Sequence, residues 1–167
     1  MKKTVTLALL TAVSLILFVV ELQIPPLTPF PWVKIGLANM VTLFILYRKD
    51  FTAIDAVLVV ILRVLLAAVI TGSMTSLFFS FCGGTAAILA MLALTKIAPD
   101  SNLKPHAAIT SVTGALAHNL AQITVAVFMY GGFGVLTYLP ALVLSGILSG
   151  LLTGFAVTIL IKRVRFL

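Results

Sequence analysis

Charged residues are scarce in this chain, and so are the residues that build disulfide and metal frameworks. Only 9% of its 167 residues are charged and only four are acidic, whereas 62% are hydrophobic. A soluble domain of this size cannot bury so much apolar surface, so the composition predicts an integral membrane protein. The single cysteine, Cys82, excludes an internal disulfide framework and a cysteine-based metal site. We expect no metal and no other cofactor.

The eleven basic residues give the chain a formal net charge of +7. They interrupt the apolar runs instead of forming one basic face, which argues against a nucleic-acid partner and is typical of membrane topology signals. Most of the runs reach the roughly 20 residues that cross a bilayer as a helix. We expect an all-α membrane protein, residues 1–167 forming one integral membrane domain. Its six transmembrane helices are predicted at residues 4–24, 32–47, 52–71, 76–98, 106–130 and 138–161.

The basic residues also predict the orientation of these helices. With six spans and a cytoplasmic N-terminus, nine of the eleven basic residues are cytoplasmic, and only Lys34 and Arg63 are not. The run 32–47 is short, but a re-entrant segment there would place the basic C-terminus outside, against the positive-inside rule. We therefore expect a multi-pass protein of a bacterial-type cell membrane with both termini in the cytoplasm.

Four prolines separate the first two runs, within the segment IPPLTPFPWVKIGLANM at residues 24–40. Proline breaks helices and lacks an N–H, and backbone buried in lipid must be hydrogen-bonded. The segment should therefore lie at the outer membrane surface or line a cavity, and we predict that it forms the lid and wall of a ligand site. Trp32 either anchors this segment in the interfacial belt or stacks on a flat ligand.

Polar residues within the apolar runs converge on the middle to outer layer of the membrane. Arg63 lies about 18 Å from the cytoplasmic end of its predicted helix, and His118 lies about 20 Å into the fifth helix. Ionisable groups at such depth are costly and are functional candidates by default. A cavity lined by Lys34, Arg63 and amide donors would favour a ligand that carries a carboxylate or phosphate on an apolar body. The residues assigned to this site are Trp32, Lys34, Asn39, Arg63, His118, Asn119 and Gln122.

Each of these polar residues has a structural alternative. Lys34 could extend its amine to the outer headgroups from a helix end. Arg63 could form an ion pair with Glu21 or Asp55. The polar side chains of the run 106–130 could form hydrogen bonds between helices, as such groups commonly do in membrane bundles.

Small residues recur at helical spacing in two of the runs. Ala8 and Ala12 form A-x-x-x-A in the first run, while Gly146, Gly150 and Gly154 form a double G-x-x-x-G in the last. Such patterns let a second helix backbone approach closely. We expect the glycines to pack within the chain, and the alanines either to do the same or to contact a partner.

Four motifs make the chain recognisable as a member of a family. It is similar, in these motifs and over nearly its whole length, to the Gx transporter family, often labelled heptaprenyl diphosphate synthase component I. That family looks related to the substrate-binding S-components of energy-coupling factor (ECF) transporters. The motifs are WVKIGLANM at 32–40, LRVLL at 62–66, TGSMTSLFFSFCGG at 71–84 and AHNLAQ at 117–122.

The resemblance implies an S-component-like bundle that captures a small vitamin-like, or isoprenoid- or quinone-related, molecule from outside. S-components dock on a membrane coupling protein that is attached to two ATPase subunits. In related S-components an alanine motif on the first helix makes this contact, and Ala8 and Ala12 match its spacing. The chain has no Walker sequence, so we expect it not to be an enzyme and expect its partners to hydrolyse ATP.

The synthase label implies prenyl diphosphate chain elongation. That reaction requires clustered carboxylates that hold Mg²⁺ on a diphosphate. The four acidic residues are Glu21, Asp50, Asp55 and Asp100, and their spacing forms no such cluster. Two alternatives to an importer subunit stay open. One is a solitary small-molecule transporter, and the other is a non-catalytic membrane accessory of prenyl diphosphate or quinone metabolism.

Overall fold

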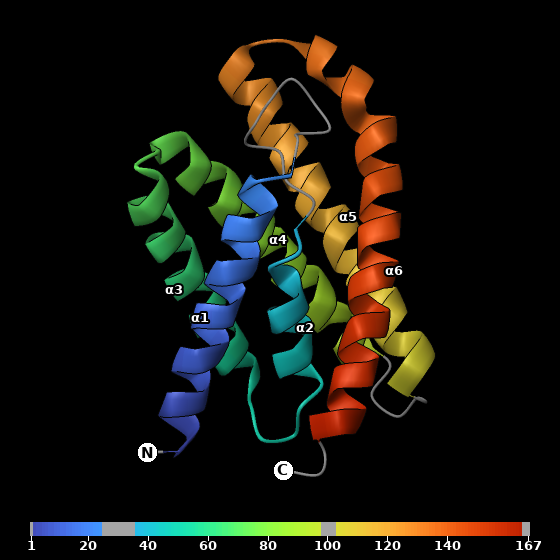
Figure 1. The fold of residues 1–167 in the computed structure, drawn as a ribbon. Helices are drawn as coiled ribbons and strands as arrows, with labels where there is room; N and C mark the ends of the chain where they lie inside the picture. Colours follow the sequence, from blue (N-terminus) through green and yellow to red (C-terminus); the bar gives the residue numbers. More distant parts are fainter. Residues whose placement is uncertain (1, 25–35, 98–102, 165–167) are drawn as a thin grey trace.

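The structure, a computed structural model, describes residues 2–24, 36–97 and 103–164, and these residues contain helices and no strand (Figure 1). This confirms the all-α prediction. The helices are α1 (Lys2–Leu22), α2 (Asn39–Leu46), α3 (Ala53–Thr71), α4 (Met74–Ile97), α5 (Leu103–Tyr130), the 3₁₀-helix η1 (Phe133–Tyr138) and α6 (Leu139–Val164).

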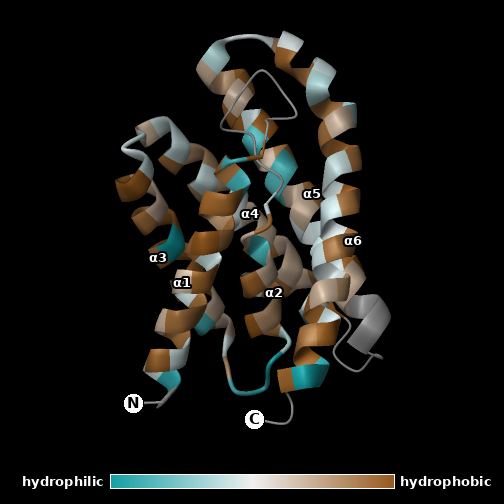
Figure 2. Ribbon diagram, in the orientation of Figure 1, coloured by the Kyte–Doolittle hydropathy of each residue, from teal (hydrophilic) through white to brown (hydrophobic). Residues whose placement is uncertain are grey.

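Five helical segments are long and apolar enough to cross a membrane: α1, α3, α4, α5, and α6 together with η1. Figure 2 shows that hydrophobic residues dominate these helices, whereas the segment that joins α2 to α3 is hydrophilic. The outward-facing side chains of α1, α3 and α6 are largely aliphatic or aromatic. The chain is therefore a multi-pass membrane protein.

The second helix is shorter than the predicted run 32–47. It begins at Asn39, because Gly36 has a left-handed φ of +87° and the next two residues form a turn. Its eight residues extend about 12 Å, which is less than half of a bilayer core. Residues 32–35 of the predicted helix lie outside the described residues.

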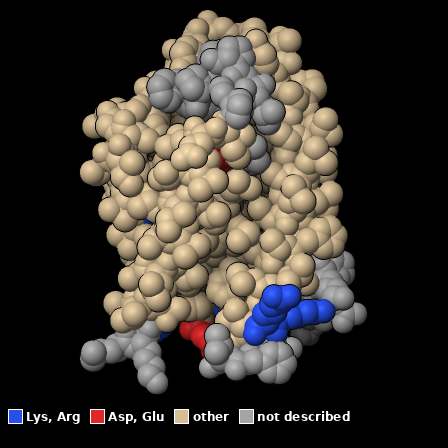
Figure 3. Space-filling view, in the orientation of Figure 1, with Lys and Arg blue, Asp and Glu red and all other residues tan. Residues whose placement is uncertain are grey.

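The start of α1 and the end of α6 lie at the same end of the molecule (Figure 1). We call this the basic end, because the basic residues at the described helix termini and loops gather there. On the face drawn in Figure 3, the basic side chains likewise gather near the termini. We call the other end, where α3 meets α4 and α5 meets η1, the opposite end. The basic end carries Lys3, Arg48, Lys49, Lys96, Lys162 and Arg163.

The residues at the helix ends explain where the helices begin and end. Thr52 and Asp55 form a capping box at the start of α3, and Asp55 also lies 2.8 Å from Lys3 Nζ. Gly72 ends α3 in a left-handed conformation with a φ of +60°, which glycine adopts without strain. Because Asp55 pairs with Lys3, it is not the partner of Arg63 that the sequence analysis left open.

Packing places α2 at the centre of the bundle and α1 at its edge. The short helix α2 contacts all five of the other α-helices, whereas α1 contacts only α2 and α3 among the helices that the structure describes. The most extensive contact joins α5 to α6. There, a Cβ atom added to Gly150 would lie 2.6 Å from Val112 Cα, and one added to Gly154 would lie 2.6 Å from Ala108 Cα. These glycines therefore pack within the chain, as predicted.

Candidate functional site

A group of buried polar side chains surrounds a small cavity between five helices. We call this group the polar cluster; each member is less than 10% exposed. The cavity has a volume of about 10 Å³, enough for roughly one water molecule. Phe18 of α1 supplies an apolar wall. The members of the polar cluster are Glu21 of α1, Asn39 of α2, Arg63 of α3, Ser80 of α4, and His118 and Gln122 of α5.

Hydrogen bonds satisfy only part of the polar cluster. The backbone N–H of Gly36 donates to Glu21 Oε1, and Asn39 Nδ2 lies 3.3 Å from His118 Nδ1. In the part of the chain that the structure describes, Arg63 Nε and Nη2 and Asn39 Oδ1 have no hydrogen-bond partner. Glu21 and Arg63 line the same cavity. The cluster thus holds a buried cation whose donors are not fully used.

Glycines of α4 make room for the two largest members of the cluster. A Cβ atom at Gly83 would lie 2.8 Å from Cε1 and 2.9 Å from Nδ1 of His118. A Cβ atom at Gly84 would lie 3.1 Å from Arg63 Nη2. Adjacent glycines on a helix present bare backbone to both neighbours, so imidazole and guanidinium can lie directly against α4. The G-G pair of the TGSMTSLFFSFCGG motif therefore positions the cluster.

The structure brings four of the predicted site residues together and separates a fifth. The four are Asn39, Arg63, His118 and Gln122, all in the polar cluster. Asn119 faces α6 instead, where its Nδ2 donates to the carbonyl oxygen of Leu142 at 2.7 Å. That bond is the interhelical alternative, and it arises because Asn119 is rotated by about 100° from His118 around α5. The other two predicted site residues, Trp32 and Lys34, lie outside the described residues.

Four residues that line the cavity were not among the predicted site residues: Phe18, Glu21, Gly36 and Ser80. Glu21 and Ser80 are polar residues within apolar runs, so depth alone could have added them. Phe18 gave no signal, because it is one of many apolar residues in its run. Gly36 lies within the motif WVKIGLANM, but only the structure shows that its N–H donates to Glu21.

The predicted partner-binding alanines lie on the outer surface of α1. Ala8 and Ala12 are both exposed, and neither lies at a contact with α2 or α3 that buries it. Their large neighbours Val5, Leu9 and Ile16 are exposed as well. This face of α1 is therefore available to lipid or to another protein.

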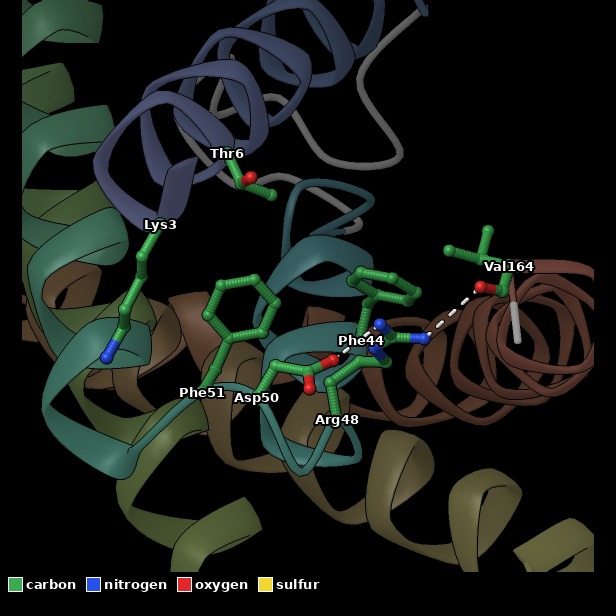
Figure 4. Close-up of a pocket in the computed structure, with 7 residues that line it drawn as sticks. All are labelled: Lys3, Thr6, Phe44, Arg48, Asp50, Phe51 and Val164. Atoms are coloured by element: carbon green, nitrogen blue, oxygen red, sulfur yellow. Dashed lines mark hydrogen bonds and ion pairs between the residues drawn. The ribbon is translucent and has the colours of Figure 1, made fainter. Parts of the chain in front are cut away.

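A second, larger cavity lies at the basic end, and no sequence motif indicated it. Its volume is about 320 Å³. Of its charged lining groups, Arg48 pairs with Asp50, and Lys3 pairs with Asp55 outside the lining. Figure 4 shows Arg48 joined to Asp50 and, through Nη1, to the carbonyl oxygen of Val164, which ties the α2–α3 loop to the end of α6. Phe44 and Phe51 lie on either side of these groups. This cavity has its polar groups paired, unlike the polar cluster.

Comparison with known proteins gives the family of the chain. No curated protein matches it, and no solved structure matches it. The family model described as heptaprenyl diphosphate synthase component I matches residues 10–160, which include every member of the polar cluster. This match covers most of the chain and confirms the family that the four motifs indicated. The chain belongs to the heptaprenyl diphosphate synthase component I family.

Proposed function

We propose that the chain is the substrate-binding membrane subunit of an ECF-type ATP-driven importer. Its substrate is a small vitamin-like, or isoprenoid- or quinone-related, molecule. One observation carries the proposal: five helices of a membrane protein converge on a buried polar cluster with unsatisfied donors. In a bilayer interior such groups cost free energy, and a bundle that needed only packing would have apolar residues there.

The charge distribution supports the orientation of this site. By the positive-inside rule, the basic end faces the cytoplasm of a bacterial-type cell membrane. The polar cluster, near the end of α1 that is remote from Lys3, then lies in the outer half of the membrane. A binding subunit that collects its substrate from outside needs its site in that half.

The positions of the carboxylates argue against a catalytic role in prenyl diphosphate synthesis. Glu21 lies in the polar cluster, Asp50 pairs with Arg48, and Asp55 pairs with Lys3 at the basic end. Chain elongation requires several carboxylates around Mg²⁺ on one diphosphate, and these three are distributed over both ends of the bundle. We therefore assign no enzymatic step to the chain, and its ATPase partners supply the energy.

The exposed face of α1 suits the coupling protein. Small side chains at Ala8 and Ala12 let a partner helix approach closely in the membrane. Ala8→Leu and Ala12→Leu should weaken co-purification with the coupling protein and the two ATPase subunits. Folding should be unchanged, because both side chains are exposed. As a control, Ala86→Leu tests a partly buried alanine of α4, away from this face.

Native mass spectrometry of the purified full chain tests the binding function directly. We expect a retained small molecule in the wild-type protein, and loss of that molecule in Arg63→Ala and His118→Ala proteins that remain monodisperse. Equal retention by both variants and the wild type would contradict the placement of the site.

Two further outcomes separate the alternatives. Uptake by liposomes that contain this chain alone would identify a solitary transporter. If deletion of the chain lowered the abundance of an enzyme of prenyl or quinone metabolism but left uptake unchanged, the chain would be a membrane accessory.

A further inference from the structure

The guanidinium of Arg63 presents one unused edge inside the membrane domain. Arg63 is 3% exposed and lines the small cavity of the polar cluster. Its Nε and Nη2 atoms both lack a hydrogen-bond partner among the described residues. These two nitrogens form one side of the planar guanidinium, and their N–H groups are parallel. That arrangement matches two oxygens of a carboxylate or a phosphate.

An arginine that served only packing would not leave this edge unused. A buried donor without a partner destabilises the protein, and more so when it is charged. A Cβ atom added to Gly84 would lie 3.1 Å from Nη2, so the guanidinium lies close to the α4 backbone. The unused edge is therefore a binding position for an anionic group of a ligand.

The size of the cavity shows that this group cannot enter without a movement. A space of about 10 Å³ holds roughly one water molecule, whereas a carboxylate or phosphate with an apolar body is many times larger. Among the described helices around the cavity, α1 has the fewest neighbours, since within the described residues it contacts only α2 and α3. It is therefore the helix that can move with the least loss of packing.

Charge indicates what the movement of α1 would achieve. Glu21 of α1, an acidic residue, lines the same cavity as Arg63. A second anion next to Glu21 would be repelled strongly in this poorly solvated site. Displacement of α1 would carry Glu21 away and leave Arg63 to the incoming anion.

We propose that the ligand carries a carboxylate or phosphate that binds side-on to Nε and Nη2 of Arg63. This anion replaces Glu21 as the nearest negative charge and displaces the end of α1. The proposal rests on the proposed binding function and adds the chemical class of the ligand. It also connects the site to the exposed face of α1, because both lie on one helix.

The test uses four small probes with the same phenyl ring: benzoate, phenyl phosphate, benzyl alcohol and benzylammonium. The thermal unfolding midpoint of the detergent-solubilised full chain is measured against the concentration of each probe. We expect one or both anions to raise the midpoint, and the neutral and cationic probes to leave it unchanged. Stabilisation by benzoate alone identifies a carboxylate, and stabilisation by phenyl phosphate alone identifies a phosphate.

Two variants test the geometry. Arg63→Lys retains the positive charge but loses the fork, so the anion should bind about tenfold more weakly. Glu21→Gln removes the competing charge, so the anion should bind several-fold more tightly. Arg48→Lys replaces an arginine of the basic end and serves as the control. It should leave the affinity for the anion unchanged.

Three results would overturn the proposal: no stabilisation by either anion, an unchanged affinity in Arg63→Lys, or weaker anion binding in Glu21→Gln. The binding function itself is tested separately by the molecule retained in native mass spectrometry. A retained neutral or cationic molecule would leave that function standing and would refute the anionic ligand. Anion stabilisation without any retained molecule would support the anionic ligand and contradict the expectation that the ligand stays bound during purification.

Discussion

The two faces of α5 show how differently one helix can use polar and small residues. The face toward α6 is a closed seam: Gly150 lies against the backbone of Val112, and Ser111 Oγ lies 2.6 Å from Thr153 Oγ1. The face toward α2 and α4 carries His118 and Gln122 and belongs to the polar cluster. One face is packed to backbone contact, and the other surrounds a cavity next to unsatisfied donors.

Structural and functional polar residues of this bundle differ in how fully their hydrogen-bonding groups are used. Along the seam, the hydroxyls of Thr153 and Thr158 also donate to carbonyl oxygens within α6, at 2.8 Å each. Their hydrogen-bonding capacity is used locally, so they need no other molecule. In the polar cluster, Arg63 has capacity left over. On the face toward α6, Asn119 Oδ1 also lacks a partner among the described residues, so it is the buried charged group with unused donors that marks the site.

The largest expected effect comes from breaking the seam. In Gly150→Leu, the new side chain would start 2.6 Å from Val112 Cα and 2.9 Å from its N atom, so α5 and α6 would have to separate. We expect a loss of at least about 3 kcal/mol in the free energy of unfolding. Thermal unfolding and the monodisperse fraction in detergent measure it. Gly134→Leu is the matched control, because open space surrounds that glycine; equal stability of the two variants would show that the seam is not rigid.

An intermediate effect should separate binding from stability at the α4–α5 interface. Gly83→Ala would press on the His118 ring and should weaken binding of whichever anion stabilises the wild type about tenfold, since a displaced polar group no longer fits its ligand. Stability should change by no more than about 1 kcal/mol, because alanine favours the helix.

Gly114→Ala at the same interface provides the contrast. Its Cβ atom would meet Met91 Cε at 2.2 Å, outside the polar cluster. We expect this variant to lose stability and to bind with unchanged affinity. If both variants affected binding equally, binding and stability would not be separable at the α4–α5 interface.

The smallest effect is expected for a single hydroxyl of the seam. Ser111→Ala removes the bond to Thr153, whose hydroxyl retains its bond to the carbonyl oxygen of Ser149. Hydrogen bonds between membrane helices contribute about 0.6 kcal/mol on average, so the unfolding midpoint should fall only slightly. Phenyl phosphate should bind as it does to the wild type. A marked loss of affinity would mean that the seam and the polar cluster are coupled.

Hydrophobicity was enough to predict most of the helices. The predicted run 52–71 agrees with α3 within one residue, because Thr52 and Gly72 are strong start and stop signals. The run 32–47 was a less accurate prediction, since its apolar composition hides the left-handed conformation of Gly36. A composition measure cannot detect a backbone torsion that depends on tertiary contacts.

Depth along the helices was enough to predict part of the site. It placed Arg63 and His118 in one layer, and the structure brings both to the polar cluster. Depth does not determine direction around a helix axis, so it could not separate Asn119, which faces α6, from Gln122, which faces the cavity. It also could not show that Glu21 would share the cavity with Arg63.

The central position of α2 has a consequence for how the bundle assembles. Eight residues are too few to hold a stable helix across a bilayer alone, and α2 contacts every other α-helix of the described chain. Its backbone amides can therefore be protected from solvent exchange only after the surrounding helices have come together. Hydrogen exchange at residues 39–46 would report the integrity of the whole bundle from its smallest helix.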